Sequence, residues 1–293
     1  MQTFVISPSR NRSVMSDNNQ NTGFLQAVDG VRLFYREWLH PQPRGAVVLV
    51  HGLGEHGGRY RQLAGIFHAA GFSVRIHDHR GHGRSEGPRG SVRTNDDFLE
   101  DLKIAFDDFA AAAQTTPFLF GHSMGGLVAA RFATGGWSKV RGLMLSSPAL
   151  AIRMSGFQKF LLALTTQIAP GFAVPTSLPA QRLSHDEAVV RDFQGDPLNH
   201  GKVAARVVNF MLDAMACVQR DAGMFTSPLL LQFAGEDAFV DPAGSRAFFA
   251  HVPQVDKTMH GYDDAFHEIF NESAERRLRA QNDLLAWLEL HVQ

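Results

Sequence analysis

Short apolar runs alternate with amphipathic helical segments along most of this chain of 293 residues. One such run, Ala46–Val50, reads AVVLV, and comparable runs recur at 72–76, 117–120, 140–145, 228–233 and 256–260. Apolar residues at helical spacing predict helices at 59–70, 97–113, 124–133, 243–250 and 274–290. Runs that are apolar on both faces and alternate with helices are typical of an α/β fold with a mostly parallel central sheet and helices on both faces.

Two segments lie outside this alternation. Residues 149–226 contain apolar helical stretches and no obvious strand, and the segment is too long for a loop, so we expect an inserted helical cap there. Residues 1–22 are polar and lack periodicity, which predicts a disordered N-terminal tail, with Met15 as an alternative start. The core then comprises 23–148 and 227–293 and opens with a hairpin at 24–38.

Charge and cysteine counts exclude several classes of protein. The 28 basic and 29 acidic residues give a net charge of −1, which argues against a nucleic-acid partner. A single cysteine, Cys217, excludes an intrachain disulfide, and we interpret it as a buried apolar residue in a reducing compartment. The chain contains neither an apolar stretch of membrane-spanning length nor a signal-peptide pattern, so we expect a cytoplasmic location.

The segment Gly121-His122-Ser123-Met124-Gly125 matches the pattern G-x-S-x-G. It follows a predicted strand and opens a predicted helix, which is the context of a nucleophile elbow. Such a turn exposes the serine hydroxyl above the sheet, and the helix N-terminus directs amide groups at developing negative charge. Ser123 is therefore the candidate nucleophile.

A serine nucleophile needs a base, and the base needs an acid that orients it. In chain order Asp237 and then His267 follow Ser123, each after a predicted strand and hence at the same edge of the sheet. Glu236 and Asp241 are the alternative acids, and Asp241 is interpreted as a helix N-cap because a proline follows it. The alternative bases are His251, at a helix end, and His260, at a strand end.

The glycine-rich stretch at 51–54 follows the AVVLV strand and completes the expected site. Its glycines allow a bend that directs the Leu53 amide inward. Together with the Met124 amide, it would form an oxyanion hole.

A histidine cluster at His77, His79 and His82 raises the question of a metal site. The spacing is not that of a binuclear hydrolase, and alternate residues of an extended chain point to opposite faces. We therefore interpret the segment as a structural turn held by Asp78 and Arg80, and we expect neither a metal nor an organic cofactor.

These motifs resemble the α/β-hydrolase superfamily, and most closely its monoglyceride lipase and lysophospholipase branch of serine-aminopeptidase-like hydrolases. The resemblance runs from about residue 24 to the C-terminus. It rests on HGLGEHGGRY at 51–60, DHRGHGRSEGPRG at 78–90, GHSMGG at 121–126, HEIFNE at 267–272 and the cap segment 183–203.

The resemblance implies an α/β-hydrolase fold with the nucleophile, acid, base and oxyanion donors named above. It further implies that Glu55 and Arg59 bind or organise the glycerol end of a substrate, with His122 and Phe193 as further candidate contacts. Phe193 departs from the animal monoglyceride lipases, which carry a tyrosine at that place, so a hydroxyl that could meet the glycerol is missing.

The leading hypothesis is a cofactor-free serine hydrolase that cleaves monoacylglycerol through an acyl-enzyme. The alternatives are a lysophospholipase, a broad-specificity carboxylesterase, a non-catalytic ligand receptor and an aminopeptidase. An aminopeptidase would need acidic cap residues for a free amine, for which Asp186, Glu187, Asp192 and Asp196 are the candidates.

An apolar stripe on the cap suggests how an oily substrate reaches Ser123. Its members share one face at helical spacing and are Phe157, Phe160, Leu161, Leu164 and Ile168. The stripe is interpreted as a surface packed on the domain below, as the lining of an acyl tunnel, or as a transient contact with a membrane surface.

Overall fold

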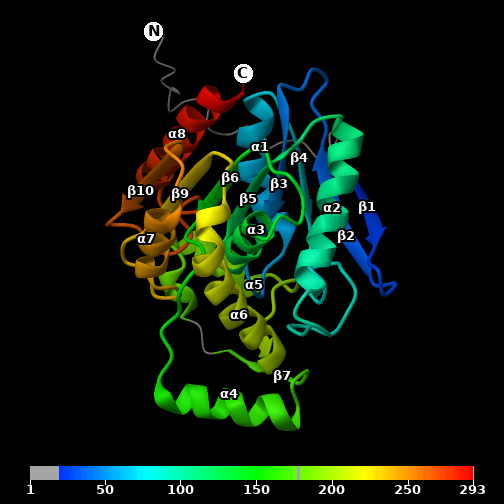
Figure 1. The fold of residues 1–293 in the computed structure, drawn as a ribbon, viewed down its shortest axis with the longest axis vertical. Coiled ribbons are helices and arrows are strands. Elements are labelled where there is room, and N and C mark those ends of the chain that lie inside the picture. Colours follow the sequence, from blue (N-terminus) through cyan, green and yellow to red (C-terminus); the bar gives the residue numbers. More distant parts are fainter. Residues whose placement is uncertain (1–19, 177–178, 293) are drawn as a thin grey trace.

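A mostly parallel sheet of eight strands forms the centre of the protein (Figure 1). The computed structural model describes residues 20–176 and 179–292. The strand order is β1-β2-β4-β3-β5-β6-β9-β10, and β2 is antiparallel to both of its neighbours while all other pairs are parallel. The strands are Asn21–Gln26 (β1), Arg32–Trp38 (β2), Gly45–Val50 (β3), Phe72–His77 (β4), Phe118–His122 (β5), Leu143–Ser146 (β6), Leu229–Ala234 (β9) and Lys257–Tyr262 (β10). The predicted fold class is confirmed.

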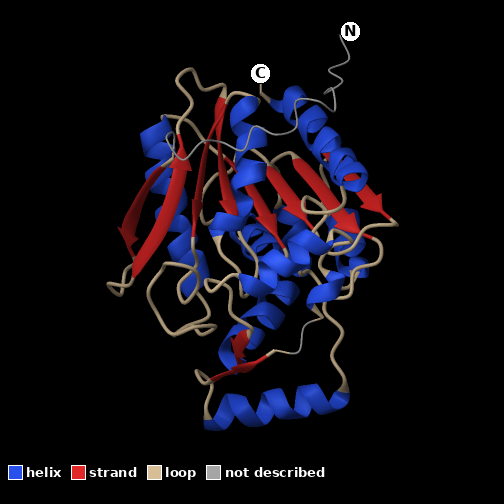
Figure 2. Cartoon of the chain, turned by 180° about the vertical axis from the view of Figure 1, so that it is seen from behind, coloured by secondary structure: helices blue, strands red, loops and turns tan. Residues whose placement is uncertain are grey.

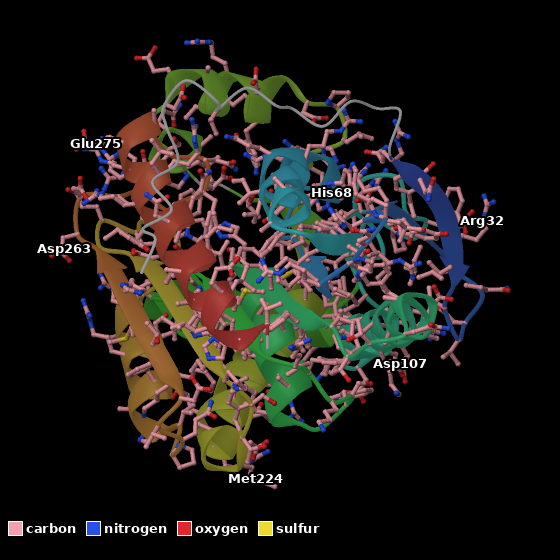
Figure 3. All side chains as sticks on the ribbon, turned by 90° about the horizontal axis from the view of Figure 1, so that it is seen from above. Arg32, His68, Asp107, Met224, Asp263 and Glu275 are labelled. Carbon is pink, nitrogen blue, oxygen red and sulfur yellow. The ribbon has the colours of Figure 1, made fainter. Side chains whose placement is uncertain are left out.

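Helices cover both faces of this sheet (Figure 2). One face carries α2 (Asp97–Ala113), α3 (Met124–Thr134), α6 (Ala205–Asp221) and α7 (Pro242–His251). The other face carries α1 (Arg61–Ala69) and α8 (Ala274–His291), and a 3-10 turn, η3 (Gly57–Tyr60), precedes α1. Figure 3 shows the charged side chains of Asp107, Asp263 and Glu275 at the outline of the molecule, outside these layers.

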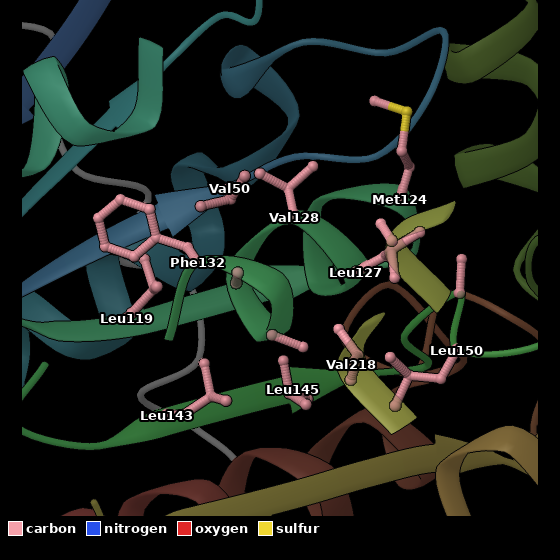
Figure 4. Close-up of a cluster of buried hydrophobic side chains, with 14 of the residues drawn as sticks. Val50, Leu119, Met124, Leu127, Val128, Phe132, Leu143, Leu145, Leu150 and Val218 are labelled. Carbon is pink, nitrogen blue, oxygen red and sulfur yellow. The ribbon is translucent and has the colours of Figure 1, made fainter. Parts of the chain in front are cut away.

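The helix α3 lies directly on β3, β5 and β6 and belongs to the buried core. Val50, Leu119 and Leu145 of these strands meet Leu127 and Phe132 of the helix, and all are at most 1% exposed (Figure 4). Burying an aliphatic side chain of this size contributes roughly 2 kcal/mol, so this layer holds α3 firmly against the sheet.

Two boundaries differ from the sequence expectation. β1 begins at Asn21, inside the expected tail, because Asn21 and Thr22 pair with Glu37 and Arg36 of β2. Residues 1–19 of that expected tail lie outside the described residues. β10 runs to Tyr262, so that His260 lies within the strand and not at its end.

Between β6 and β9 the chain forms the expected helices and also a small sheet. The elements not yet named are α4 (Gly156–Ile168), β7 (Ala173–Pro175), η4 (Ala180–Arg182), α5 (Glu187–Gly195), β8 (Lys202–Ala204) and η5 (Ala222–Met224). The antiparallel pair β7–β8 shows that the expectation of a segment without strands is wrong. The sequence did not predict these strands because three residues are too few to show a periodic pattern. Cys217 on α6 is half-buried, not buried as expected.

α4 and α6 differ in how much of their surface is covered. The buried face of α6, including Val207, Phe210 and Val218, joins the same core cluster as α3. α4 lies at the far end of the molecule, away from the sheet (Figure 1). It begins with a capping box in which Ser155 and Gln158 satisfy each other's backbone amides, so local hydrogen bonds contribute to its stability.

The close approach of α3 to β3 depends on Gly125. A Cβ at this position would overlap the carbonyl oxygens of Val50 and His51, which belong to the backbone and have no freedom to move away. We expect Gly125→Ala to lower the free energy of unfolding by about 3 kcal/mol, as measured by urea denaturation. Gly223→Ala, where nothing lies within 4 Å of the new Cβ, is the matched control. Equal stability of the two variants would contradict this account of the packing.

Candidate active site

Ser123 occupies a strained turn between β5 and α3. Its φ is 54° and its ψ is −124°, a backbone conformation that non-glycine residues rarely adopt. The Ser123 amide donates to the Ser146 carbonyl at 3.1 Å, and its carbonyl accepts from the amides of Leu127 and Ala149 at 3.1 and 3.0 Å. Three backbone hydrogen bonds from two directions therefore hold the turn.

His267 and Asp237 form a buried pair beside this turn. His267 Nδ1 lies 2.7 Å from Asp237 Oδ2, and the two side chains are 3% and 1% exposed. The other oxygen, Asp237 Oδ1, accepts from the amides of Phe239 and Val240. Burial alone would raise the pKa of Asp237, but His267 and these two amides hold it below its usual value. The acid is thus kept ionised.

The His267 ring is also fixed from two sides. Phe239 stacks on it at a centroid distance of 4.8 Å, and the ring of His122, the neighbour of Ser123, lies 4.8 Å away. Burial, together with the neighbouring His267, lowers the pKa of His122 to about 4, so His122 is neutral at pH 7.

Three of the four alternative acids and bases, Asp241, Glu236 and His260, face other charged partners. Asp241 accepts from the Ala243 amide at the start of α7 and pairs with Arg153, in agreement with the N-cap interpretation. Glu236 faces Arg182 at 3.7 Å, and His260 faces Asp283 at 3.7 Å. His251 is the last residue of α7.

The loop after β3 lies against Ser123. A Cβ on Gly52 would stand 3.2 Å from the Ser123 Cβ, which shows how close the two backbones are. Gly54 has a φ of 75°, and its carbonyl accepts from the amide of His200 in the cap. Within the part of the chain that the structure describes, the amides of Leu53 and Met124 donate to no protein acceptor. Both are therefore available to an oxygen anion.

Glu55 and Arg59 belong to a buried network of charges. Glu55 accepts from the Gly52 amide at 2.6 Å, from the Tyr60 hydroxyl at 2.7 Å and from Arg59. Arg59 also donates to both oxygens of Glu268, at 2.7 and 2.8 Å, in a fork. The network thus joins the loop of Leu53 to the loop of His267.

Glu268 is a member of this network that the sequence analysis missed. It follows His267 directly, and a carboxylate beside the candidate base was the one available signal. Burial would raise its pKa, but the charge and hydrogen bonds of Arg59 hold it well below its usual value. The Arg59 guanidinium also lies over the ring of Phe193, 4.8 Å from the ring centre. Arg59 is therefore surrounded by protein partners.

The histidine segment forms a buried turn. Among the described residues no group of three or more histidines, cysteines or carboxylates could hold a metal. Burial lowers the pKa of His77 to about 4 and that of His82 to about 3, so these rings are neutral at pH 7. Arg80 pairs with Asp97 and Asp101.

Three of the four acidic cap residues expected of an aminopeptidase have other partners. Asp186 accepts from the Ala188 amide at the start of α5, and Glu187 faces Arg191 on the same helix. Asp196 pairs with His56 at 2.8 Å. The remaining residue, Asp192, lines a polar pocket beside α5.

The apolar stripe of α4 is exposed, which overturns the interpretation that it packs on the domain below. Phe157, Phe160 and Ile168 are 73%, 66% and 73% exposed, and the other two members are also exposed. The opposite side of α4, with Leu162 and Thr166, borders a pocket of about 840 Å³ that also touches α6. No helix among the described residues is long and apolar enough to cross a bilayer.

The fork between Arg59 and Glu268 predicts that removal of the Arg59 guanidinium strongly destabilises the protein. Without Arg59, Glu55 and Glu268 would stay buried without their cation, which costs about 3 kcal/mol or more. We expect Arg59→Met to lower the free energy of unfolding by this amount at pH 7. The loss should shrink toward pH 5, since burial raises the pKa of an unpaired Glu268 and protonation then removes its charge.

Urea denaturation at both pH values measures this effect, with Arg220→Met as the control. Arg220 is exposed and pairs with its chain neighbour Asp221, so its removal should change stability by less than about 1 kcal/mol. A pH-independent loss in Arg59→Met would point to lost packing instead of unpaired charge.

Comparisons with known proteins show the family and the fold of the chain. The family model described as "Serine aminopeptidase, S33" matches residues 41–274. A monoacylglycerol lipase of Mycolicibacterium smegmatis is 34% identical, over 95% of this chain and 100% of its own. The crystal structure of a monoacylglycerol lipase from Paleococcus ferrophilus superposes with a TM-score of 0.80 at 34% identity, covering 88% of this chain and 99% of that one. A monoglyceride lipase variant from Saccharomyces cerevisiae shares the fold with a TM-score of 0.85 at 22% identity, covering 93% and 96%. The chain therefore has the α/β-hydrolase fold and belongs to the serine hydrolase family described as serine aminopeptidase S33.

Proposed function

We propose that this chain hydrolyses monoacylglycerols to a fatty acid and glycerol, with Ser123 as nucleophile, His267 as base and Asp237 as the orienting acid. The observation that carries the proposal is the buried His267–Asp237 pair beside a serine held at a positive φ. Two relatives that are each 34% identical to this chain are monoacylglycerol lipases, which supports the substrate class.

The reaction proceeds in two halves. In the first, Ser123 Oγ attacks the ester carbonyl carbon while His267 takes the hydroxyl proton, and the carbonyl oxygen becomes an anion. The amides of Leu53 and Met124 stabilise this oxyanion, each contributing about 3 kcal/mol. His267 then gives its proton to the glycerol oxygen, and the carbon–oxygen bond to glycerol breaks.

In the second half, water replaces glycerol. His267 takes a proton from the water, whose oxygen attacks the acyl-enzyme, and collapse of the second intermediate restores Ser123 and releases the fatty acid. Asp237 stays ionised throughout and stabilises the imidazolium, as its lowered pKa allows. Neither half needs a metal or an organic cofactor.

The triad assignment predicts unequal effects for two neighbouring aspartates. Ser123→Ala should abolish turnover of a monoacylglycerol with little change in melting temperature. Asp237→Asn should lower kcat by about 10,000-fold, because the amide no longer orients or stabilises the imidazolium. Asp241→Asn, which alters only a helix cap and a surface pair, should keep nearly full kcat.

The assay is release of fatty acid from a monoacylglycerol, with melting temperature as the control for folding. Activity that survives in Ser123→Ala would reject the nucleophile. Labelling of Ser123 by a fluorophosphonate without turnover of any ester would favour the ligand-receptor alternative.

We also propose that α4 has two roles for an oily substrate, and that the protein contacts membrane surfaces peripherally from the cytoplasm. The exposed stripe, which includes Phe157 and Phe160, offers aromatic side chains to a lipid surface. The pocket on the other side of the helix, bordered by Leu162, would take the acyl chain. Each methylene that it removes from water contributes roughly 0.8 kcal/mol.

The two faces of α4 can be tested separately. Phe157→Ser with Phe160→Ser should weaken co-sedimentation with phospholipid vesicles and leave turnover of a soluble butyryl ester unchanged. Leu162→Ser should lower kcat/KM for a palmitoyl ester far more than for the butyryl ester, with vesicle binding retained. Equal losses on both esters with a lowered melting temperature would show that α4 is ordinary structural packing.

A further inference from the structure

The loop at residues 51–58, which carries the Leu53 amide, is held by the core at two points. The Gly52 amide donates to Glu55 at 2.6 Å, and the Gly57 amide donates to Asp78 at 2.8 Å. Neither bond involves Leu53 itself. The position of its amide therefore also depends on what meets the loop between these two points.

The cap meets the loop there through its backbone. The amide of His200 donates to the carbonyl of Gly54 at 2.8 Å, and a Cβ on Gly54 would stand 2.4 Å from the His200 carbonyl oxygen. The ring of His200 packs against the buried ring of His82 in the core, at a centroid distance of 4.4 Å. An anchored piece of the cap thus lies directly against the residue that follows Leu53.

A second link joins the cap to the same loop through two side chains. His56 Nδ1 accepts from the Gly58 amide at 3.1 Å, so a neutral ring carries its proton on Nε2. His56 Nε2 donates to Asp196 Oδ2 at 2.8 Å. The His56 side chain is 6% exposed, so water competes little for this hydrogen bond.

Asp196 is itself fixed at the end of α5. Its other oxygen, Oδ1, accepts from the Leu198 amide at 2.8 Å, and its carbonyl accepts from the Asn199 amide at 3.1 Å. Burial would raise the pKa of Asp196, but the hydrogen bonds from His56 and from the Leu198 amide hold it below its usual value. Asp196 thus offers His56 an ionised acceptor in a defined place, which makes this hydrogen bond a strong one.

Both links come from one turn of the cap, residues 196–200, and they reach the loop at Gly54 and at His56. Two contacts restrain the orientation of this short stretch more than either contact alone. Precision matters at this place, because a misplacement of about 1 Å in a group that acts on the transition state can cost on the order of 100-fold in rate.

We propose that Asp196, acting through His56, is a positioning residue that holds the Leu53 amide where it stabilises the oxyanion. The inference rests on the proposed function, which assigns the oxyanion to the amides of Leu53 and Met124. It adds a role in catalysis for the cap turn 196–200, which touches the loop and not the reacting atoms.

Two substitutions of His56 separate the link to Asp196 from the local structure of η3. His56→Asn keeps an oxygen for the Gly58 amide, since asparagine is a favoured N-cap residue, but is too short to reach Asp196. His56→Gln reaches Asp196 with its amide nitrogen but offers the Gly58 amide no acceptor at the place of Nδ1. With a soluble butyryl ester, we expect His56→Asn to lower kcat about tenfold, with KM changed by less than about twofold, and His56→Gln to lose much less.

Asp196→Asn tests the same link from the side of the cap. An asparagine has one oxygen for the two donors of His56 and Leu198, so one of the two hydrogen bonds is lost. We expect the same fall in kcat as in His56→Asn, and no further fall when the two substitutions are combined, because both break one link. Asp256→Asn is the matched control, since Asp256 pairs with His291 at 2.9 Å far from the loop, and it should keep the kcat of the wild type.

A transition-state analogue supplies the second readout. An alkyl trifluoromethyl ketone forms a bond from its carbonyl carbon to Ser123 Oγ, the hydroxyl proton passes to His267, and the carbonyl oxygen becomes an anion in the oxyanion hole. Its inhibition constant should rise about tenfold in Asp196→Asn and stay unchanged in Asp256→Asn. Melting temperatures of all variants control for folding.

An unchanged kcat in Asp196→Asn and His56→Asn would overturn the proposal. So would an equal loss in His56→Gln and His56→Asn, which would point to the local structure of η3, or a change in KM alone, which would point to substrate binding. The butyryl ester and the ketone report on the oxyanion hole for any natural substrate. These failures are therefore distinct from a failure of the proposed function, which shows as absent turnover of monoacylglycerol or as activity that survives in Ser123→Ala.

Discussion

The backbone of Ser123 holds a positive φ, and the candidate active site is arranged around this one turn. Such a conformation costs roughly 1–3 kcal/mol and persists only where its surroundings enforce it. Here they are the 3.1 Å bond from the Ser123 amide to β6, the bonds from Leu127 and Ala149 to its carbonyl, and the contact of Gly125 with β3. The packing of α3 on the sheet therefore stabilises this turn. The ring of His122, the residue before Ser123, lies 4.8 Å from the ring of His267.

Buried charge fixes the loops that this turn does not reach. Leu53 and His267 lie on loops separated by more than 200 residues of sequence, and Arg59 connects them by binding Glu55 on one side and Glu268 on the other. A buried fork of this kind adds little net stability over an apolar substitute, but it permits few alternative arrangements. The sequence predicts that Glu55 and Arg59 bind or organise the glycerol end of a substrate. In the structure the polar atoms of both side chains already have protein partners, and the two residues hold the two loops in place.

The sequence predicted those features that local physics determines and missed those that depend on distant neighbours. Apolar runs and helical spacing located the sheet strands and α2, whose predicted range of 97–113 is the observed one. The assignment of Ser123, Asp237 and His267 as nucleophile, acid and base stays a prediction, which the observed His267–Asp237 pair supports. Helical spacing showed that the α4 stripe shares a face, but not that solvent covers this face, because periodicity carries no information about what lies opposite. The role of Glu268 could not be predicted from local sequence either, because its partner Arg59 is 209 residues away.

The two large pockets described here lie on different sides of the cap and differ in chemistry. The pocket under α4 is bordered by apolar residues, among them Leu162 and Leu212, and by polar ones such as Thr166, whereas the pocket beside α5 is bordered mostly by charged and polar residues. An amphiphile has one apolar end and one polar end, so it gains free energy in only one of its two orientations across such a cap. Under the proposed function, this asymmetry would direct the acyl chain toward α4 and the alcohol toward the pocket beside α5. The two pockets together would then orient the substrate. A tyrosine hydroxyl at the position of Phe193 would not be needed for this.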